Sequence, residues 1–158
     1  MSEIDHSLFE LKTLEITKTD AAEKLTKLVP TYTWESIKTE LLHLAKKTAS
    51  KHSVLKFISA PARLEFLTAL AIKYKLPNIE VIPNYPCDDE GLPTSTAGGG
   101  IGDIECFETD NNTLVEVTMA EGRQQTMMEV WPISRHLEEF KSKYDDKESQ
   151  CVFIAPSI

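Results

Sequence analysis

Closely spaced carboxylates in the second half of the chain are the residues whose spacing could support chemistry. IGDIECFE and TLVEVTM alternate apolar and polar residues as half-buried strands do, and Asp110-Asn111-Asn112 between them favours a turn. With Asp110-Asn111 as the loop, Asp103 lies opposite Thr118, and Glu105 lies opposite Glu116. All four side chains then share one face of the hairpin. Such carboxylates are either solvated at a sheet edge or neutralised by a hard cation such as Mg²⁺ bound between them.

Two predicted helices bring further polar groups toward this hairpin. Residues 120–144 are predicted as a helix that carries Gln125 and Glu129 on adjacent turns, facing back toward the strand end. An upstream helix over residues 60–75 carries Glu65, either as a fourth acid or as a boundary ion pair. The opposite face of the hairpin is predicted to join the core, through Ile104, Cys106, Val115, Val117 and Met119.

The remaining elements must hold these groups in place. Short amphipathic helices are predicted over residues 5–14 and 20–29, and a longer helix over 33–50 begins at a Thr33 cap. The predicted apolar side of the longer helix consists of Ile37, Leu41, Leu42 and Ala45. A long connection over residues 76–100 is interrupted only by the apolar run IEVI. Pro132 predicts a kink or break in the last helix, and CVFIAP predicts a buried strand beside the hairpin.

Basic residues outside the acidic hairpin are candidates for contacts with phosphate. Lys46 and Lys47 lie on the outer side of the helix over residues 33–50, where a solvated helix end is the favoured explanation and contact with a phosphate backbone is the alternative. Arg135 and His136 lie in the second half of the last helix. One role for His136 is in catalysis, since imidazole titrates near neutrality. We expect instead that the pair contacts backbone or DNA phosphate, because metal-dependent hydrolysis needs no histidine.

Composition indicates one soluble globular domain over residues 1–158. The apolar share is 41% and the charged share 27%, and no run approaches the length of a membrane span. The acidic, polar N-terminus is unlike a signal peptide, and three distant cysteines fit neither a disulfide framework nor a zinc site. These features predict a cytoplasmic protein with no membrane partner.

Charge is distributed unevenly along the chain, whose net charge is −8. Residues 1–80 contain 12 Lys and Arg against 10 Asp and Glu, whereas residues 81–158 contain 5 against 15. The proposed site therefore lies in the acidic half. Since phosphate neutralisation dominates nonspecific affinity for DNA, we expect tight target binding to come from another domain or chain.

The spacing Asp-x12-Glu-x-Thr on a hairpin resembles the PD-(D/E)xK nuclease pattern, with Thr118 where a lysine usually stands. Over residues 63–143 the chain resembles the AlwI-type family of type IIS restriction and nicking endonucleases. The most specific pieces are GDIE, LVEVT followed by G-x-x-Q-x-x-x-E, and RHL. The resemblance places the family's acids on Glu65, Asp103, Glu116 and Glu129, with a metal-binding carbonyl at Val117 and Gln125 nearby. The missing lysine leaves open which group orients the attacking water.

The resemblance implies an α/β (α+β) fold, in which helices flank a restriction-endonuclease-like mixed sheet. The helical part spans about residues 1–76, and the catalytic hairpin with the following helix and strand spans about 97–158. The implied function is Mg²⁺-dependent (or Mn²⁺-dependent) cleavage of double-stranded DNA in a restriction-modification system. Cutting occurs at a fixed distance from a site recognised by another domain or subunit, and a transient dimer would allow both strands to be cut. Isolated, such a domain would nick or be inactive.

Two other functions remain open on the residues alone. The first is a non-enzymatic acidic module that binds a protein partner, with its carboxylates solvated. The second is a nuclease-like fold that has lost activity, given Thr118 in place of lysine.

Overall fold

The computed structural model describes residues 10, 12, 18 and 20–156, and between residues 122 and 131 it describes the backbone alone. Residues 20–28 are helical, and the 3-10 helix η1 follows at Val29–Thr31. Next come α2 (Trp34–Ala45), the 3-10 helix η2 (Leu55–Phe57), α3 (Ala60–Lys75) and β1 (Glu80–Pro83). The chain continues through β2 (Ile104–Phe107), β3 (Asn111–Val117), α4 (Gly122–Lys143) and β4 (Glu148–Ile154). The helix predicted over residues 5–14 lies almost wholly outside the described residues.

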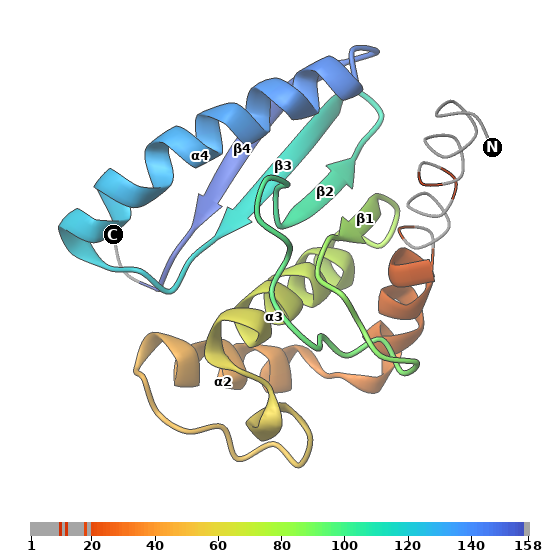
Figure 1. Ribbon diagram of the computed structural model, residues 1–158. Helices are drawn as coiled ribbons and strands as arrows, with labels where there is room; N and C mark the ends of the chain where they lie inside the picture. Colours follow the sequence, from red (N-terminus) through yellow and green to blue (C-terminus); the bar gives the residue numbers. More distant parts are fainter. Residues whose placement is uncertain (1–9, 11, 13–17, 19, 157–158) are drawn as a thin grey trace.

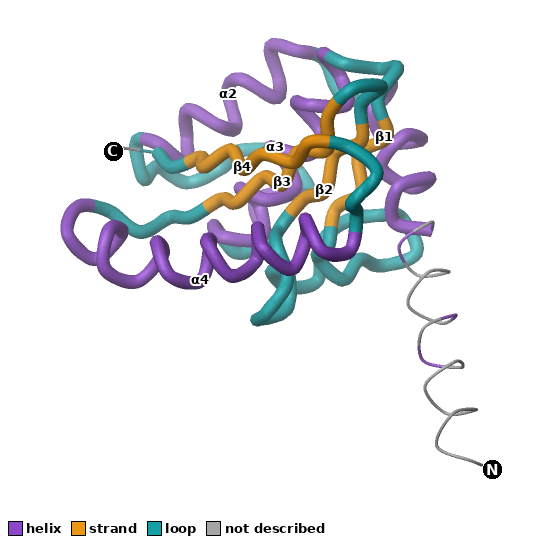
Figure 2. Tube along the Cα trace, turned by 90° about the horizontal axis from the view of Figure 1, so that it is seen from above, coloured by secondary structure: helices purple, strands orange, loops and turns teal. Residues whose placement is uncertain are grey.

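The described strands form one mixed sheet in the order β1-β2-β3-β4, in which only β4 runs parallel to its neighbour. Figure 1 shows α4 above the strands of this sheet and α2 and α3 below them. Figure 2 shows the same elements from above, with the strands in orange. The α+β class with a mixed sheet between helices is therefore confirmed. No described helix is both long and apolar enough to cross a membrane.

The hairpin confirms the predicted division into two faces but corrects the predicted pairing. Ile104, Cys106 and Val115 are 0–3% exposed and belong to the core on the α3 side, with Val117 and Met119 packed against it. The observed register pairs Ile104 with Val115, which is two residues away from the predicted pairing. The reason is the turn: the Glu108 N–H donates to the Asn111 carbonyl (3.0 Å), so the tip is Thr109-Asp110.

Helix α2 begins as predicted and ends early. The Thr33 side chain accepts from the Ser36 N–H (3.1 Å), which satisfies one of the free donors at the helix start. The helix ends at Ala45, not near Ser50, because Lys47 adopts a left-handed φ of 54°. The predicted apolar side was also partly wrong: Leu42 is 55% exposed and Ala45 is exposed, whereas Leu44 is buried.

Helix α3 is the central helix of the core. It begins directly after Ser59, as predicted, and every residue from Ala62 to Leu70 is buried. Phe66, Leu67 and Leu70 are fully buried and belong to the same cluster as the apolar face of the hairpin. The charged residue Glu65 is thus carried inside the molecule and does not lie at its boundary.

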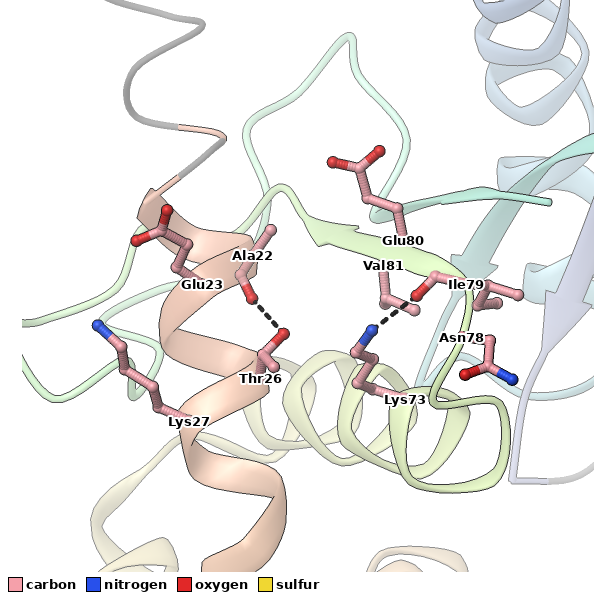
Figure 3. A pocket seen from close by; sticks show the side chains of 9 residues that line it. All are labelled: Ala22, Glu23, Thr26, Lys27, Lys73, Asn78, Ile79, Glu80 and Val81. Atoms are coloured by element: carbon pink, nitrogen blue, oxygen red, sulfur yellow. Dashed lines mark hydrogen bonds between the residues drawn. The ribbon is translucent and has the colours of Figure 1, made fainter. Parts of the chain in front are cut away.

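The two edge strands and α4 complete the fold. Helix α4 continues through Pro132, so of the predicted kink or break the break does not occur. Strand β4 lies beside the hairpin as predicted, but it is mostly half-exposed or exposed and not buried. The other edge strand, β1, borders an open groove of about 550 Å³ between α3 and the helix over residues 20–28 (Figure 3). In that groove Lys73 Nζ donates to the Ile79 carbonyl (2.7 Å) and occupies part of the free edge.

Candidate active site

Two predicted ligands, Asp103 and Glu116, lie next to each other where β2 begins and β3 ends. The observed register, continued one step beyond the Ile104–Val115 pair, sets Asp103 opposite Glu116. Asp103 Oδ2 accepts from the Val117 N–H at 2.7 Å, so its side chain reaches across to β3. Both side chains thus face the end of the same strand pair, closer together than the predicted register implied.

Glu65 approaches the same end of the sheet from α3. Its side chain is only 4% exposed, and Oε2 accepts from the Ala97 N–H at 2.8 Å. Burial, and then the negative charge of Asp103, raise the pKa of Glu65 to about 8, although the Ala97 hydrogen bond acts against this rise. A third carboxylate is therefore near enough to Asp103 for the two charges to repel each other.

His136 contacts the site directly, which the sequence analysis did not predict. Its Nδ1 lies 2.8 Å from Glu116 Oε1, and both side chains are at most 10% exposed. Because a carboxylate only accepts hydrogen bonds, Nδ1 carries the proton and donates the hydrogen bond to Glu116. Helix α4 thereby fixes the orientation of this carboxylate from the side opposite α3.

Gly102 and Asn84 shape the backbone immediately before Asp103. A Cβ added at Gly102 would lie 2.3 Å from Leu114 Cδ1 and 3.1 Å from Glu116 Oε1, so a larger residue fits here only if the Leu114 side chain shifts. Asn84, directly after β1, holds this segment twice. Its backbone N–H donates to the Asp103 carbonyl (2.9 Å), and its side-chain amide donates to the Gly102 carbonyl (2.7 Å).

A further buried carboxylate, Glu105, lies on the same sheet face next to the site. It accepts from Lys18 Nζ at 2.8 Å and from the Tyr144 hydroxyl at 3.0 Å. These three residues come from distant parts of the chain, and the sequence analysis identified neither partner. A small cavity of about 140 Å³ lies here, and Lys18, Glu105, His136 and Lys143 are among the residues that line it.

Cys151 faces the acids from the neighbouring strand β4. It pairs with Leu114 in the parallel ladder, which sets it on the face of Glu116. Burial raises the pKa of Cys151 to about 11, and the charges of Glu116 and Asp103 add to the rise. The thiol therefore stays protonated near neutral pH.

The other predicted site residues are distributed as follows. Thr118 Oγ1 accepts from the Ala120 N–H (3.1 Å) at the turn into α4. Arg135 is exposed, with its Nε 3.7 Å from Glu139. Lys46 is exposed, whereas Lys47 pairs with Glu121 at 2.8 Å. The side chains of Gln125 and Glu129 lie outside the described part of α4.

The donor chemistry at the end of the sheet fits a hard divalent cation. Asp103, Glu116 and Glu65 supply carboxyl oxygens. Burial, and then the charge of Asp103, raise the pKa of Glu65 and so disfavour its ionised form, which a bound cation would favour. These acids supply suitable donor atoms but do not form a preassembled site, because among the described side chains no three of His, Cys, Asp or Glu are grouped closely enough to hold an ion.

Two comparisons with known proteins gave matches. The family model for the AlwI restriction endonuclease matches residues 4–158. Among solved structures, the small subunit of the heterodimeric restriction endonuclease R.BspD6I is similar, with a TM-score of 0.59 and 27% identity. The match covers 77% of this chain and 60% of that subunit, so the chain spans well under the subunit's full length. The curated proteins contain no match.

Proposed function

This chain belongs to the AlwI restriction endonuclease family, and on that premise we propose that it is a metal-dependent DNA cleavage module. The observation that carries the proposal is the approach of three buried or half-buried carboxylates, Glu65, Asp103 and Glu116, to one end of the sheet. They come from three different elements, which an acidic surface patch would not require. Their mutual repulsion would be relieved by a cation.

Each candidate site residue has a defined role in this proposal. Asp103 and Glu116 would bind the ion together with the Val117 carbonyl, and His136 would hold Glu116 in orientation. Glu65 and Glu129 would bind a second cation or orient the attacking water, with Gln125 beside them. Bound there, Mg²⁺ or Mn²⁺ would supply Lewis-acid chemistry, polarising the phosphate and promoting ionisation of water.

Thr118 replaces the usual lysine and adds no positive charge. Its hydroxyl already accepts from Ala120, so it shapes the turn into α4. Arg135 and Lys46 are exposed and would contact DNA phosphates, whereas Lys47 would first have to leave Glu121.

We further propose that sequence recognition resides in another domain or subunit. The similar solved structure is one subunit of a heterodimer, and the net charge of −8 disfavours tight DNA binding by this chain alone. Cleavage at a fixed distance from a recognised site would follow from that division, and we propose a transient dimer for cutting both strands.

Metal titration tests the site without depending on activity. Millimolar Mg²⁺ or Mn²⁺ should raise the melting temperature, because an ion that binds only the native state stabilises it. Asp103→Asn should remove most of this response, while equal ionic strength from NaCl serves as the control. Identical melting with and without metal in both proteins would favour the non-enzymatic interaction module.

Activity is tested separately by nicking of supercoiled plasmid. The chain reconstituted with its recognition subunit should nick in Mg²⁺, and Glu116→Ala should abolish nicking. Metal binding without any nicking would indicate a nuclease fold that has lost activity.

A further inference from the structure

One stretch of this acidic protein contains no acidic residue. Between Glu40 and Glu65 the sequence holds four lysines, Arg63 and two histidines, against a net charge of −8 for the whole chain. An anionic ligand approaching the protein is therefore repelled least at this stretch. Figure 1 shows most of it as the connection between α2 and α3, at the end of the molecule away from the β2–β3 turn.

The connection is a built structure held by buried groups. Leu55 is fully buried, and the buried Arg63 donates from Nη1 to the Leu55 carbonyl (3.1 Å). His52 Nδ1 accepts from the Val54 and Leu55 N–H groups at 3.2 and 3.3 Å. The His52 ring also stacks on Tyr32, with centroids 5.7 Å apart. These contacts preorganise the side chains that the connection presents to solvent.

The presented side chains are basic and aromatic. Lys46, Lys51 and Lys56 are all exposed. Phe57 is 81% exposed, and Lys56 Nζ lies 4.9 Å from the centre of its ring. Phe57 does not belong to the hydrophobic core of the described residues, so its ring is open to a ligand. We call Lys46, Lys51, Lys56 and Phe57 the lysine platform.

The lysine platform is attached to the elements that carry the candidate site. At one end Lys47 pairs with Glu121, the residue directly before α4. At the other end Arg63, which holds the Leu55 carbonyl, precedes Glu65 by two residues on α3. The platform is therefore joined to α3, which carries Glu65, and to the start of α4.

We infer that the lysine platform binds the sugar-phosphate backbone of the DNA duplex whose cleavage is proposed above, next to the scissile bond. A duplex carries about one negative charge per 1.7 Å of its axis, so three lysines along one connection would meet neighbouring phosphates. Phe57 contacts the sugar and base surface between them, as inserted apolar side chains do in other DNA complexes. The platform supplies the local attraction that the acidic site lacks.

Salt-dependent binding tests the lysines without requiring cleavage. The full chain is titrated onto a fluorescent duplex in the absence of divalent metal, from about 20 to about 200 mM salt. Lys46→Gln/Lys51→Gln/Lys56→Gln should weaken binding and reduce the slope of log affinity against log salt by about 2 to 3, since each lost phosphate contact removes about 0.9. The matched control, Lys12→Gln/Lys27→Gln/Lys141→Gln, makes the same charge change at other exposed lysines and should leave the slope unchanged.

Phe57→Ala separates the aromatic contact from the charge. It should lower affinity by about five- to tenfold, near the low end for loss of one aromatic contact to nucleic acid, with the salt slope unchanged. Melting temperatures check that each variant folds. The inference is overturned if the platform and control triple variants bind alike, or if the wild-type chain fails to bind duplex at low salt. It is also overturned if the platform triple variant binds duplex normally but no longer binds the recognition subunit, because the platform would then be a protein interface.

This inference rests on the proposed function, yet the two fail differently. Platform-dependent binding without metal-dependent nicking would contradict the nuclease proposal and keep the platform. Nicking by a platform variant with unchanged duplex affinity would keep the nuclease and reject the platform.

Discussion

The acidic side chains at the candidate site have very different surroundings. Glu65 is buried beside another acidic residue, Asp103, and accepts a hydrogen bond from the Ala97 N–H. Glu116, in contrast, accepts from His136 at 2.8 Å. Neighbouring carboxylates with such different surroundings can bind one ion and still be protonated at different pH values.

Glu65→Gln should change the pH dependence of stability. The pKa of Glu65 is raised to about 8 in the fold from an ordinary 4.5, so the unfolded chain releases this proton first. The contribution of Glu65 to stability is therefore complete below about pH 4.5 and declines as pH rises toward about 8. The variant lacks this decline and should gain stability relative to wild type across that range. Urea unfolding at several pH values checks this, and a difference that stays constant with pH would contradict it.

Gly102→Ala should destabilise the protein and disturb Glu116. The added methyl group would lie 2.3 Å from Leu114 Cδ1, and relieving such overpacking usually costs about 1–3 kcal/mol. Gly99→Ala is the matched control, since nothing lies within 4 Å of its added Cβ. Denaturant unfolding should separate the two variants, and the Mg²⁺-induced rise in melting temperature should shrink only in Gly102→Ala. Equal stability of both variants would show that Leu114 moves aside freely.

At the scale of elements, α4 is anchored to the sheet at both its middle and its end. His136 bonds to Glu116, and further along the Tyr144 hydroxyl donates to Glu105 (3.0 Å). Phe107, Phe140 and Tyr144 form an aromatic cluster between helix and strand, with ring centroids 4.8–6.1 Å apart. The placement of α4 therefore depends on apolar packing and on hydrogen bonds to two buried carboxylates.

Tyr144→Phe should weaken the attachment of α4 while preserving its packing. Removing a hydrogen bond to a charged group usually costs about 1.5–3 kcal/mol, and the retained ring keeps its contacts with Phe107 and Phe140. Urea unfolding of Tyr144→Phe, Glu105→Gln and the double variant forms a cycle that isolates the pair. Additive losses in that cycle would mean that the two groups do not interact.

Periodicity predicted which elements form, and tertiary contacts decided the details. The two-residue alternation identified the core face of the hairpin because Ile104, Cys106 and Val115 alternate strictly. It missed the register because Thr109-Asp110 forms the tip, and Asn112 is drawn into the strand, where its amide donates to Asp146 (3.2 Å). The Lys18–Glu105 pair spans 87 residues, so no local pattern could reveal it.

At the scale of the whole molecule, the two halves of the sequence differ in charge and also form different parts of the fold. The N-terminal half contributes α2, α3 and the lysine platform, and the acidic half contributes the hairpin and α4. Only the convergence of Glu65 from the first half with Asp103 and Glu116 from the second forms the candidate site. Composition predicted the separation of charge, but not that α3 would bury one of its acids.

Screening of this charge should stabilise the molecule. Residues 81–158 hold 15 acidic against 5 basic residues, so repulsion within the folded state is strongest at low salt. The melting temperature near pH 7.5 should rise between about 10 and about 150 mM NaCl, as the Debye length shortens from about 30 to about 8 Å. KCl should act equally. A falling melting temperature would mean that ion pairs such as Lys18–Glu105 outweigh the repulsion.

Asn84 has a consequence for protein engineering. It donates hydrogen bonds to the carbonyls of Gly102 and Asp103 from the end of β1, an edge strand that lies outside the sequence motif of the acids. A transplanted fragment that began at the glycine run would carry both hairpin acids and lose the clamp that fixes the first of them. Chimeras that borrow this cleavage module should therefore graft the edge strand along with the hairpin.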